Sequence, residues 1–234
     1  LNVEDQWTQD FMETGYMAMP SADGLKVIDV YLRSANIEQS FQGTTGLRSA
    51  GRVVYTKFHG VDAAGMTAIG GQHNMQWDTL NSFGNTETIP PFTHDGKSWP
   101  LGRILKGEAG SVRGDQGMIK LLDSQGVQTP LFIDTGWLLV AHVDETVSFL
   151  KTDNARGWVM LANDATMAIN IFQELQSQGA GRAPVFEGEA WVDDYGRPYN
   201  AQTTVAAILQ DADVMSASAD AVIEVGDQVD TIKA

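Results

Sequence analysis

The sequence contains no cysteine in its 234 residues. Disulfides, thiolate metal sites and a thiol nucleophile are therefore excluded within this chain. Basic residues are also scarce, with 15 against 30 acidic residues, so the formal net charge is −15. Nucleic-acid binding needs a basic surface, and this composition excludes it. An acidic chain attracts cations such as metal ions and basic peptides, although solubility alone also explains such a charge.

Long hydrophobic runs are absent as well. No apolar stretch approaches the roughly 20 residues that cross a bilayer, and none reads as a signal peptide, so no membrane partner is expected. The chain begins with Leu1 and not with Met. This start slightly favours a processed, secreted protein over a cytoplasmic one.

What is present favours an α/β protein. Hydrophobic residues make up 43% of the chain, enough for the core of one large or two small domains. Val, Ile, Leu and aromatic runs predict strands at 25–32, 51–58, 129–134, 137–143, 146–152 and 157–162. Apolar spacing predicts helices at 165–179, 200–215 and, more weakly, 117–126. The prolines and Asp95-Gly96 favour a loop over 85–100, and the tail 216–234 reads as a strand between polar turns or a loosely held end.

Two short polar motifs carry potential chemistry. "HVD" places His142 and Asp144 at the end of the strand predicted at 137–143, with both side chains on the same face. Such a pair can serve as an acid/base and a cation anchor, or it can be a solvated pair at a strand end. "WTQDF" adds Asp10 next to Trp7. Asp10 and Asp144 can clamp a guanidinium, and Trp7 can cover its aliphatic stem.

An extended set of segments resembles the catalytic domain of the protein-arginine deiminases. These segments are WTQDFMETGYMAMP (7–20), LNSFGNTETIPP (80–91), SWPLGRILKG (98–107), WLLVAHVDETVSFL (137–150), MLANDATMAINIFQELQSQGAG (160–181) and VFEG (185–188). They occur in the order and at roughly the spacing of that family. The resemblance implies an α/β-propeller (pentein) of ββαβ modules, of which residues 1–234 would form the N-terminal portion, about three of five modules.

The resemblance also implies roles for individual residues. Asp10 and Asp144 would bind the guanidinium, His142 would act as general acid/base, and Trp7 would pack on the substrate side chain. The arginine that grips the substrate backbone in the family falls on Ser34, and Arg33 beside it is expected to substitute.

Calcium is the cofactor that the resemblance implies. Its ligands would be Gln9, Glu13, Glu87 and the backbone carbonyls of Phe83 and Thr86, an oxygen set that suits this cation. Asp10 lies between two of these ligands, so we expect a bent segment that directs Asp10 to substrate and its neighbours to metal. A second calcium site of the family is expected to be lost, because Phe11, Val30 and Arg33 replace its ligands.

The family reaction needs a cysteine thiolate that this chain does not contain. The leading hypothesis is a deiminase of peptidyl-arginine whose cysteine lies on a separate C-terminal chain of the same precursor. The alternative is a non-catalytic arginine- or calcium-binding protein derived from the same fold. A hydrolase that uses Asp10 and Asp144 as an acid pair is a more distant hypothesis.

Overall fold

The structure is a computed structural model that describes residues 5–40, 43–69, 75–193 and 196–234. The chain, predicted as a portion of one catalytic domain, divides into two compact units, Leu1–Leu161 and Ala162–Ala234. Among the described residues, no helix combines the length and the apolar character needed to span a bilayer.

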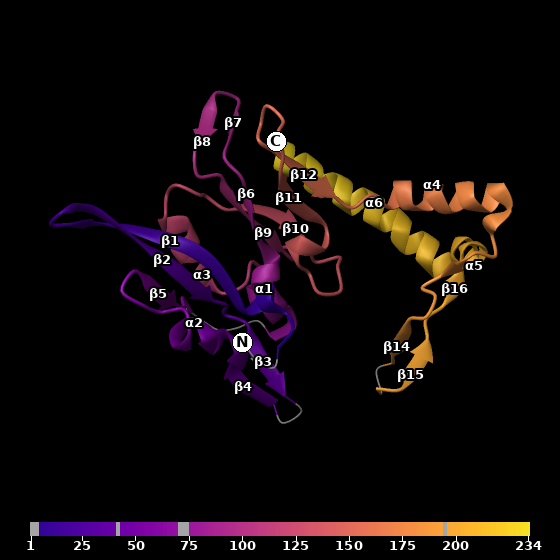
Figure 1. Cartoon of the computed structure of the whole chain (residues 1–234), viewed down its shortest axis with the longest axis horizontal. Helices are drawn as coiled ribbons and strands as arrows, with labels where there is room; N and C mark the ends of the chain where they lie inside the picture. The colour runs from indigo at the N-terminus through magenta and orange to yellow at the C-terminus, as the bar shows by residue number, and fades with distance from the viewer. Residues whose placement is uncertain (1–4, 41–42, 70–74, 194–195) are drawn as a thin grey trace. The chain divides into compact units, whose positions relative to one another are not determined.

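Two three-stranded sheets of the same design form the framework of the first unit (Figure 1). The first contains β1 (Met12–Ser21), β2 (Gly24–Arg33) and β5 (Ala63–Met66), and the second contains β6 (Thr86–Ile89), β9 (Arg103–Glu108) and β10 (Leu131–Asp134). In each sheet an antiparallel pair is followed by a helix and then by a strand parallel to the second member of the pair. This is the strand–strand–helix–strand order that a ββαβ module predicts.

The helical connections of these sheets are short. In the first sheet, η1 (Ser49–Arg52) and α2 (Val53–Thr56) precede β5, and in the second, α3 (Gln116–Ser124) precedes β10. The Asp115 side chain caps α3 by accepting hydrogen bonds from the backbone N–H groups of Gly117 and Met118. Capping explains why this helix, only weakly predicted from its sequence, forms where expected.

Small two-stranded hairpins complete the first unit. They are β3 (Ile37–Ser40) with β4 (Gly43–Leu47), β7 (Phe92–His94) with β8 (Lys97–Trp99), and β11 (Val147–Lys151) with β12 (Trp158–Ala162). Asp95 and Gly96 have φ angles of 46° and 76° and make the turn between β7 and β8. Part of the segment predicted as a loop is therefore a hairpin.

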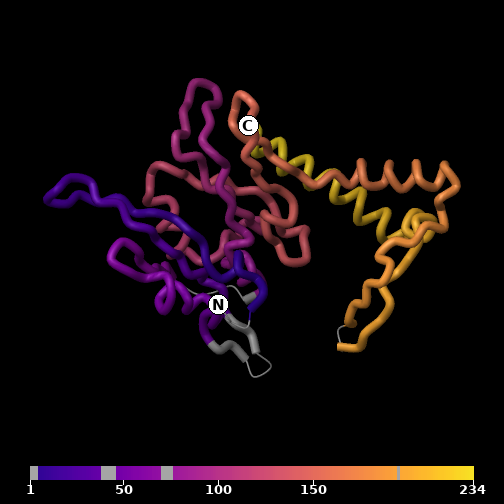
Figure 2. The backbone as a smooth tube through the Cα atoms, viewed as in Figure 1, coloured from indigo at the N-terminus to yellow at the C-terminus, as the bar shows by residue number. Residues whose placement is uncertain are grey.

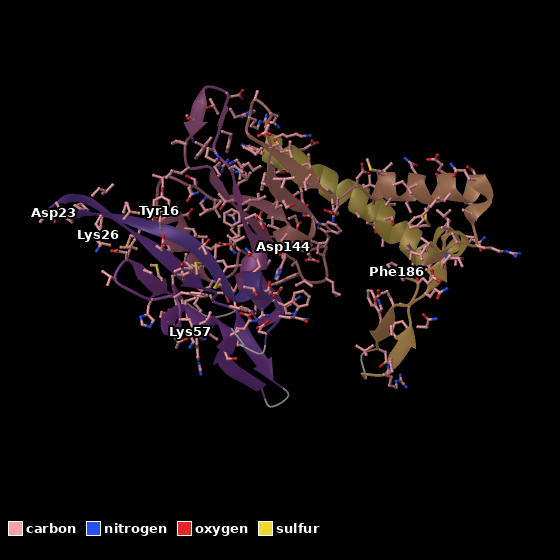
Figure 3. All side chains as sticks on the ribbon, viewed as in Figure 1. Tyr16, Asp23, Lys26, Lys57, Asp144 and Phe186 are labelled. Atoms are coloured by element: carbon pink, nitrogen blue, oxygen red, sulfur yellow. The ribbon has the colours of Figure 1, made fainter. Side chains whose placement is uncertain are left out.

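The β1–β2 hairpin extends away from the rest of the first unit (indigo in Figure 2). Its register runs from Met12 opposite Arg33 to Ser21 opposite Gly24. Most of β1 is exposed, and the labelled Tyr16, Asp23 and Lys26 lie on this arm in Figure 3. The base of the arm follows directly from α1 (Thr8–Phe11), the helical turn that carries Asp10.

The second unit is mainly helical. Its elements are α4 (Ala165–Leu175), η5 (Gln176–Ala180), α5 (Val205–Gln210), α6 (Ala212–Lys233) and four short strands, β13 (Pro184–Val185), β14 (Ala190–Val192), β15 (Pro198–Asn200) and β16 (Thr203–Thr204). α4 confirms the helix predicted after "AND", because Asp164 caps it and Gly179, at φ 84°, breaks it. Its apolar stripe is not buried, however: Met167 is 59% exposed and Ile171 52%.

Three predicted elements are wrong, and a fourth is divided into several elements. Residues 51–58 are largely helical, because Ala50, Val53 and Val54 are buried at i, i+3 and i+4, which is a helical spacing. Residues 137–143 form no strand: Leu139 is fully exposed and Ala141 adopts a φ of 62°, which ends any alternation. The tail is the helix α6, although its β-branched residues locally favour a strand. The segment predicted as one helix at 200–215 contains the last residue of β15, then β16, α5 and the start of α6.

Candidate functional site

Three segments that lie far apart in the sequence meet at one glycine. Asp10 lies on α1, Gly84 on η3 (Phe83–Asn85), and Asp144 on η4 (Val143–Glu145), which His142 precedes. An ideal Cβ built on Gly84 would lie 2.7 Å from His142 Nδ1 and 2.8 Å from both Asp10 Oδ1 and Asp144 Oδ2. The imidazole and the two carboxylates therefore face one point above Gly84. Figure 3 labels Asp144 within this unit.

Buried apolar neighbours hold each of the three segments. Phe11, next to Asp10, packs with Ala50, Val53 and Val54. Phe83, next to Gly84, belongs to a second cluster with residues of β9 and α3, and Ala141 packs with Leu80 and Ala109 in a third. Because these apolar side chains lie inside, the adjacent polar groups are directed to the common point.

Hydrogen bonds fix the imidazole of His142, which is only 4% exposed. Its Nε2 lies 3.0 Å from the carbonyl oxygen of Thr79 and 3.0 Å from Thr79 Oγ1, whose own hydroxyl donates to the carbonyl of Val140. A carbonyl can only accept, so Nε2 carries a proton, and Nδ1 is the ring nitrogen left to exchange a proton with a ligand. Nδ1 lies 3.6 Å from Asp10 Oδ1, so this ring nitrogen faces the carboxylates.

Carboxylates accumulate on one side of this site. Burial raises the pKa of Glu87 to about 7, and the negative charges of Glu13 and Asp144 add to the rise. Partial burial also raises the pKa of Asp144; His142 opposes this rise, and Asp10 and Glu145 reinforce it. Such a concentration of negative charge favours bound cations, both a substrate guanidinium and a metal ion.

Three of the predicted metal ligands, Gln9, Glu13 and Glu87, interact with one another. Gln9 Nε2 donates to Glu13 Oε2 over 2.9 Å, and Glu13 in turn raises the pKa of Glu87. In the part of the chain that the structure describes, no three His, Asp or Glu side chains form a metal cluster. The predicted set contains only two carboxylates, complemented by one amide and the carbonyls of Phe83 and Thr86. Oxygen donors of mixed kind around excess negative charge fit calcium.

The family model described as protein-arginine deiminase matches residues 1–234. The chain belongs to the protein-arginine deiminase family. It is 36% identical over 194 residues to mouse protein-arginine deiminase type-4, 36% over 192 residues to the human type-4 protein, and 35% over 199 residues to human type-3.

These matches cover 80% of the chain for both type-4 proteins and 82% for type-3, but only 26% or 27% of each relative. The chain thus spans about a quarter of the length of these curated deiminases. The α/β content of the structure is consistent with the deiminase domain.

Two further residues that the deiminase resemblance selects lie at the edges of this site. Trp7, directly before α1, has its side chain 60% exposed, and its carbonyl accepts from the N–H of Asp10 over 3.1 Å. Arg33 turns its Nη2 to the carbonyls of Leu47 and Arg48, at 3.1 and 2.8 Å. The Nη2 group of Arg33 is therefore already engaged in hydrogen bonds within the chain. The role of Arg33 in binding the substrate backbone stays a prediction.

The deiminase motifs did not by themselves reveal Gly84, Thr79 or Arg48. Gly84 lies inside the quoted "SFGN", so the signal was present, but only the fold shows that three side chains point at it. Thr79 directly precedes the quoted segment and orients His142. Arg48 lies in a stretch without a recognisable motif, yet its Nη1 donates to Asp10 Oδ2 over 2.9 Å.

Proposed function

We propose that this chain provides the guanidinium-binding half of a deiminase site that converts peptidyl-arginine to peptidyl-citrulline and releases ammonia. The observation that supports it is the convergence of Asp10, His142 and Asp144 over Gly84. Two carboxylates match the N–H donors of a guanidinium, and an imidazole nitrogen beside them can move protons. Family membership supports arginine deimination in general.

The proposed reaction needs a cysteine from outside this sequence. Its thiolate would attack the guanidinium carbon, ammonia would leave, and water would hydrolyse the thiouronium that remains, releasing citrulline and the thiolate. His142, protonated on both ring nitrogens when the thiolate attacks, would give its Nδ1 proton to the departing nitrogen and then take one from the water. We assign the cysteine to a C-terminal chain of the same precursor, and the wider scaffold to a propeller of which this chain forms about three of five modules.

An intact-mass spectrum of the native protein under denaturing conditions tests this assignment. We expect a second polypeptide that contains cysteine, and citrulline production that stops on thiol alkylation and in the Asp10→Asn, His142→Gln and Asp144→Asn variants. A single species near 25.4 kDa would leave only a non-catalytic arginine- or calcium-binding protein.

The alternative function has its own support in the cluster of carboxylates around Glu87. A chain that binds arginine without a nucleophile would retain affinity and lack turnover. Binding of a blocked arginine together with the absence of any cysteine-bearing partner would establish it.

Calcium binding by Gln9, Glu13, Glu87 and the carbonyls of Phe83 and Thr86 is a separate proposal. Calcium at 100 times its dissociation constant should stabilise the chain by about 2.7 kcal/mol. Glu87→Gln removes one ligand charge and should weaken calcium affinity at least about tenfold, because charge count sets affinity in oxygen sites.

Calorimetric titration and thermal unfolding with and without calcium measure both effects. Glu174→Gln is the matched control, since Glu174 is an exposed residue of α4 in the second unit. Equal calcium affinity in the Glu87→Gln variant and the wild type would refute this ligand set.

A further inference from the structure

Arg48 places a guanidinium of the chain itself beside the candidate site. Its Nε and Nη2 donate to the two oxygens of Asp5 over 2.6 and 2.8 Å, and its Nη1 donates to Asp10 Oδ2 over 2.9 Å. The side chains of all three residues are only about 15% exposed, at 16% for Arg48, 15% for Asp5 and 16% for Asp10. Charge-assisted hydrogen bonds of this kind, shielded from water, are strong and directional.

The backbone around Arg48 is also fixed. The N–H of Arg48 donates to the carbonyl of Asn36 over 2.9 Å, and Arg33 Nη2 donates to the carbonyl of Arg48. A Cβ on Gly51 would lie 2.7 Å from Arg33 Cγ, so a glycine at this position leaves room for the Arg33 side chain. The Arg48 guanidinium therefore presents its donors from a rigid support.

The two oxygens of Asp10 have different partners because Arg48 binds only one of them. Oδ2 accepts from Arg48, whereas Oδ1 faces His142 Nδ1 at 3.6 Å and the point above Gly84. Rotation of a carboxylate about χ2 is broad and roughly two-fold, so the Asp10 side chain alone does not select this orientation. A partner that occupies Oδ2 does select it.

We propose that Arg48 is a positioning residue of the deiminase site, which holds Asp10 so that only Oδ1 is available to a substrate guanidinium. The inference rests on the proposed function in one respect, namely that Asp10 binds the guanidinium. Asp5 supports this role, because it holds the Nε and Nη2 edge of the Arg48 guanidinium and balances its charge. Substrate would then meet Asp10 through one oxygen and make its remaining hydrogen bonds to Asp144.

The sign of the mutational effect separates this proposal from simpler roles. A positive charge near a cation site repels the ligand, so removal of Arg48 should strengthen arginine binding if charge alone matters. The same direction is expected if Arg48 competes with substrate for Asp10. If Arg48 positions Asp10, removal should weaken binding despite the more favourable charge.

Calorimetric titration of the 234-residue chain with Nα-acetyl-arginine methylamide provides the measurement, with the corresponding lysine amide as the ligand control. For Arg48→Gln we expect at least a tenfold increase in the dissociation constant. Arg48→Lys should recover part of the loss, because an ammonium can reach Asp10 but cannot span two carboxylates as the guanidinium fork does. Asp5→Asn should weaken binding about two- to threefold.

Arg52→Gln is the matched control, since Arg52 is an exposed arginine four residues further along. This variant removes the same charge and should bind arginine as the wild type does, within about twofold. Equal or tighter binding by Arg48→Gln would overturn the proposal, and so would a loss of the same size in Arg52→Gln.

A crystal structure of the Arg48→Gln variant separates a failure of this proposal from a failure of the proposed function. Should the wild-type chain not bind the arginine amide, the guanidinium-binding function fails. In that case the distance between Asp10 Oδ1 and His142 Nδ1 alone tests whether Arg48 positions Asp10. We expect Asp10 to rotate and this distance to lengthen in the variant; an unchanged 3.6 Å would overturn the proposal. If Arg48→Gln does not fold, Arg48→Lys takes its place in both measurements.

Discussion

Gly84→Ala should abolish binding of a blocked arginine while the chain still folds. The new methyl group would lie under 3 Å from His142 Nδ1, Asp10 Oδ1 and Asp144 Oδ2, which is closer than side-chain contacts permit. The two carboxylate oxygens are ends of side chains and can move aside, but the hydrogen-bonded ring of His142 must shift as a whole, so we expect a cost of about 1–3 kcal/mol. The movement displaces the groups that would hold the guanidinium, and we expect affinity to fall at least about 100-fold, roughly 2.7 kcal/mol.

The measurement is a calorimetric titration with Nα-acetyl-arginine methylamide, accompanied by thermal unfolding. Gly60→Ala is the matched control: a Cβ at Gly60 has no neighbour within 4 Å. Wild-type affinity in the Gly84→Ala variant would show that arginine does not bind at this point. If Gly84→Ala loses both folding and affinity, Gly84 is needed for the fold, and the variant gives no support for arginine binding at this point.

Wild-type stability should rise by about 3 kcal/mol more than that of a Lys106→Met variant as the pH increases from about 8 to about 10.5. Lys106 is 2% exposed on β9, and its Nζ donates to the carbonyl of Leu80 and to Thr86 Oγ1, both over 3.1 Å. Burial lowers its pKa from 10.5 to about 8, because the charged form loses its hydration.

The sign follows from proton counting. Between these two pH values the unfolded chain holds a proton on Lys106 that the folded chain has released, so stability increases with pH. The full contribution is present above pH 10.5 and is lost as the pH falls to 8. Methionine has a similar length and no charge, so this part of the dependence disappears in the variant.

Denaturant unfolding of both proteins across this pH range gives the difference directly. Lys120→Met, at an exposed position of α3, is the control and should follow the wild type. Parallel curves for wild type and Lys106→Met would mean that Lys106 has the same pKa in the folded and the unfolded chain, and would refute the prediction.

The sequence placed His142 and Asp144 close together for a reason that differs from their geometry in the structure. His142 and Asp144 were expected on one face of a strand, but they lie on an irregular segment and the short helix η4. The positive φ of Ala141 interrupts the alternation of side chains between the two faces of a strand, and no local sequence pattern predicts it. Both side chains nevertheless face the point above Gly84, so the fold brings them together by another route.

The bend at Asp10 was expected from the roles that the deiminase resemblance implies for Gln9, Asp10 and Glu13. Gln9 and Glu13 were expected to face away from Asp10, and the single helical turn α1 followed by β1 produces this separation. Gln9 contacts Glu13, while Asp10 lies by His142 and Arg48. On a regular strand Gln9 and Glu13 would also share one face while Asp10 pointed to the other, so the separation itself does not require the helical turn.

Long-range partners could not be predicted. Arg48 reaches Asp10 across 38 residues, and Lys106 reaches Leu80 across 26. Neither arginine nor lysine stands out in its local segment, since long basic side chains are usually solvated. The prediction of a strand or a loose end for residues 216–234, which form helix α6, failed for a similar reason. The β-branched residues of this segment favour a strand locally, whereas the Asp211 cap and the burial of Val225 and Gln228 favour the helix.

The convergence on Gly84 also bears on the order in which the molecule assembles. The β1–β2 arm closes through contacts between near neighbours, whereas Thr79 and His142 are 63 residues apart when they meet. Loops of that length close late, since their entropy cost precedes the contacts that repay it. The site is therefore expected to be one of the last features to form. A ligand held by all three segments would accordingly slow unfolding and leave the folding rate nearly unchanged.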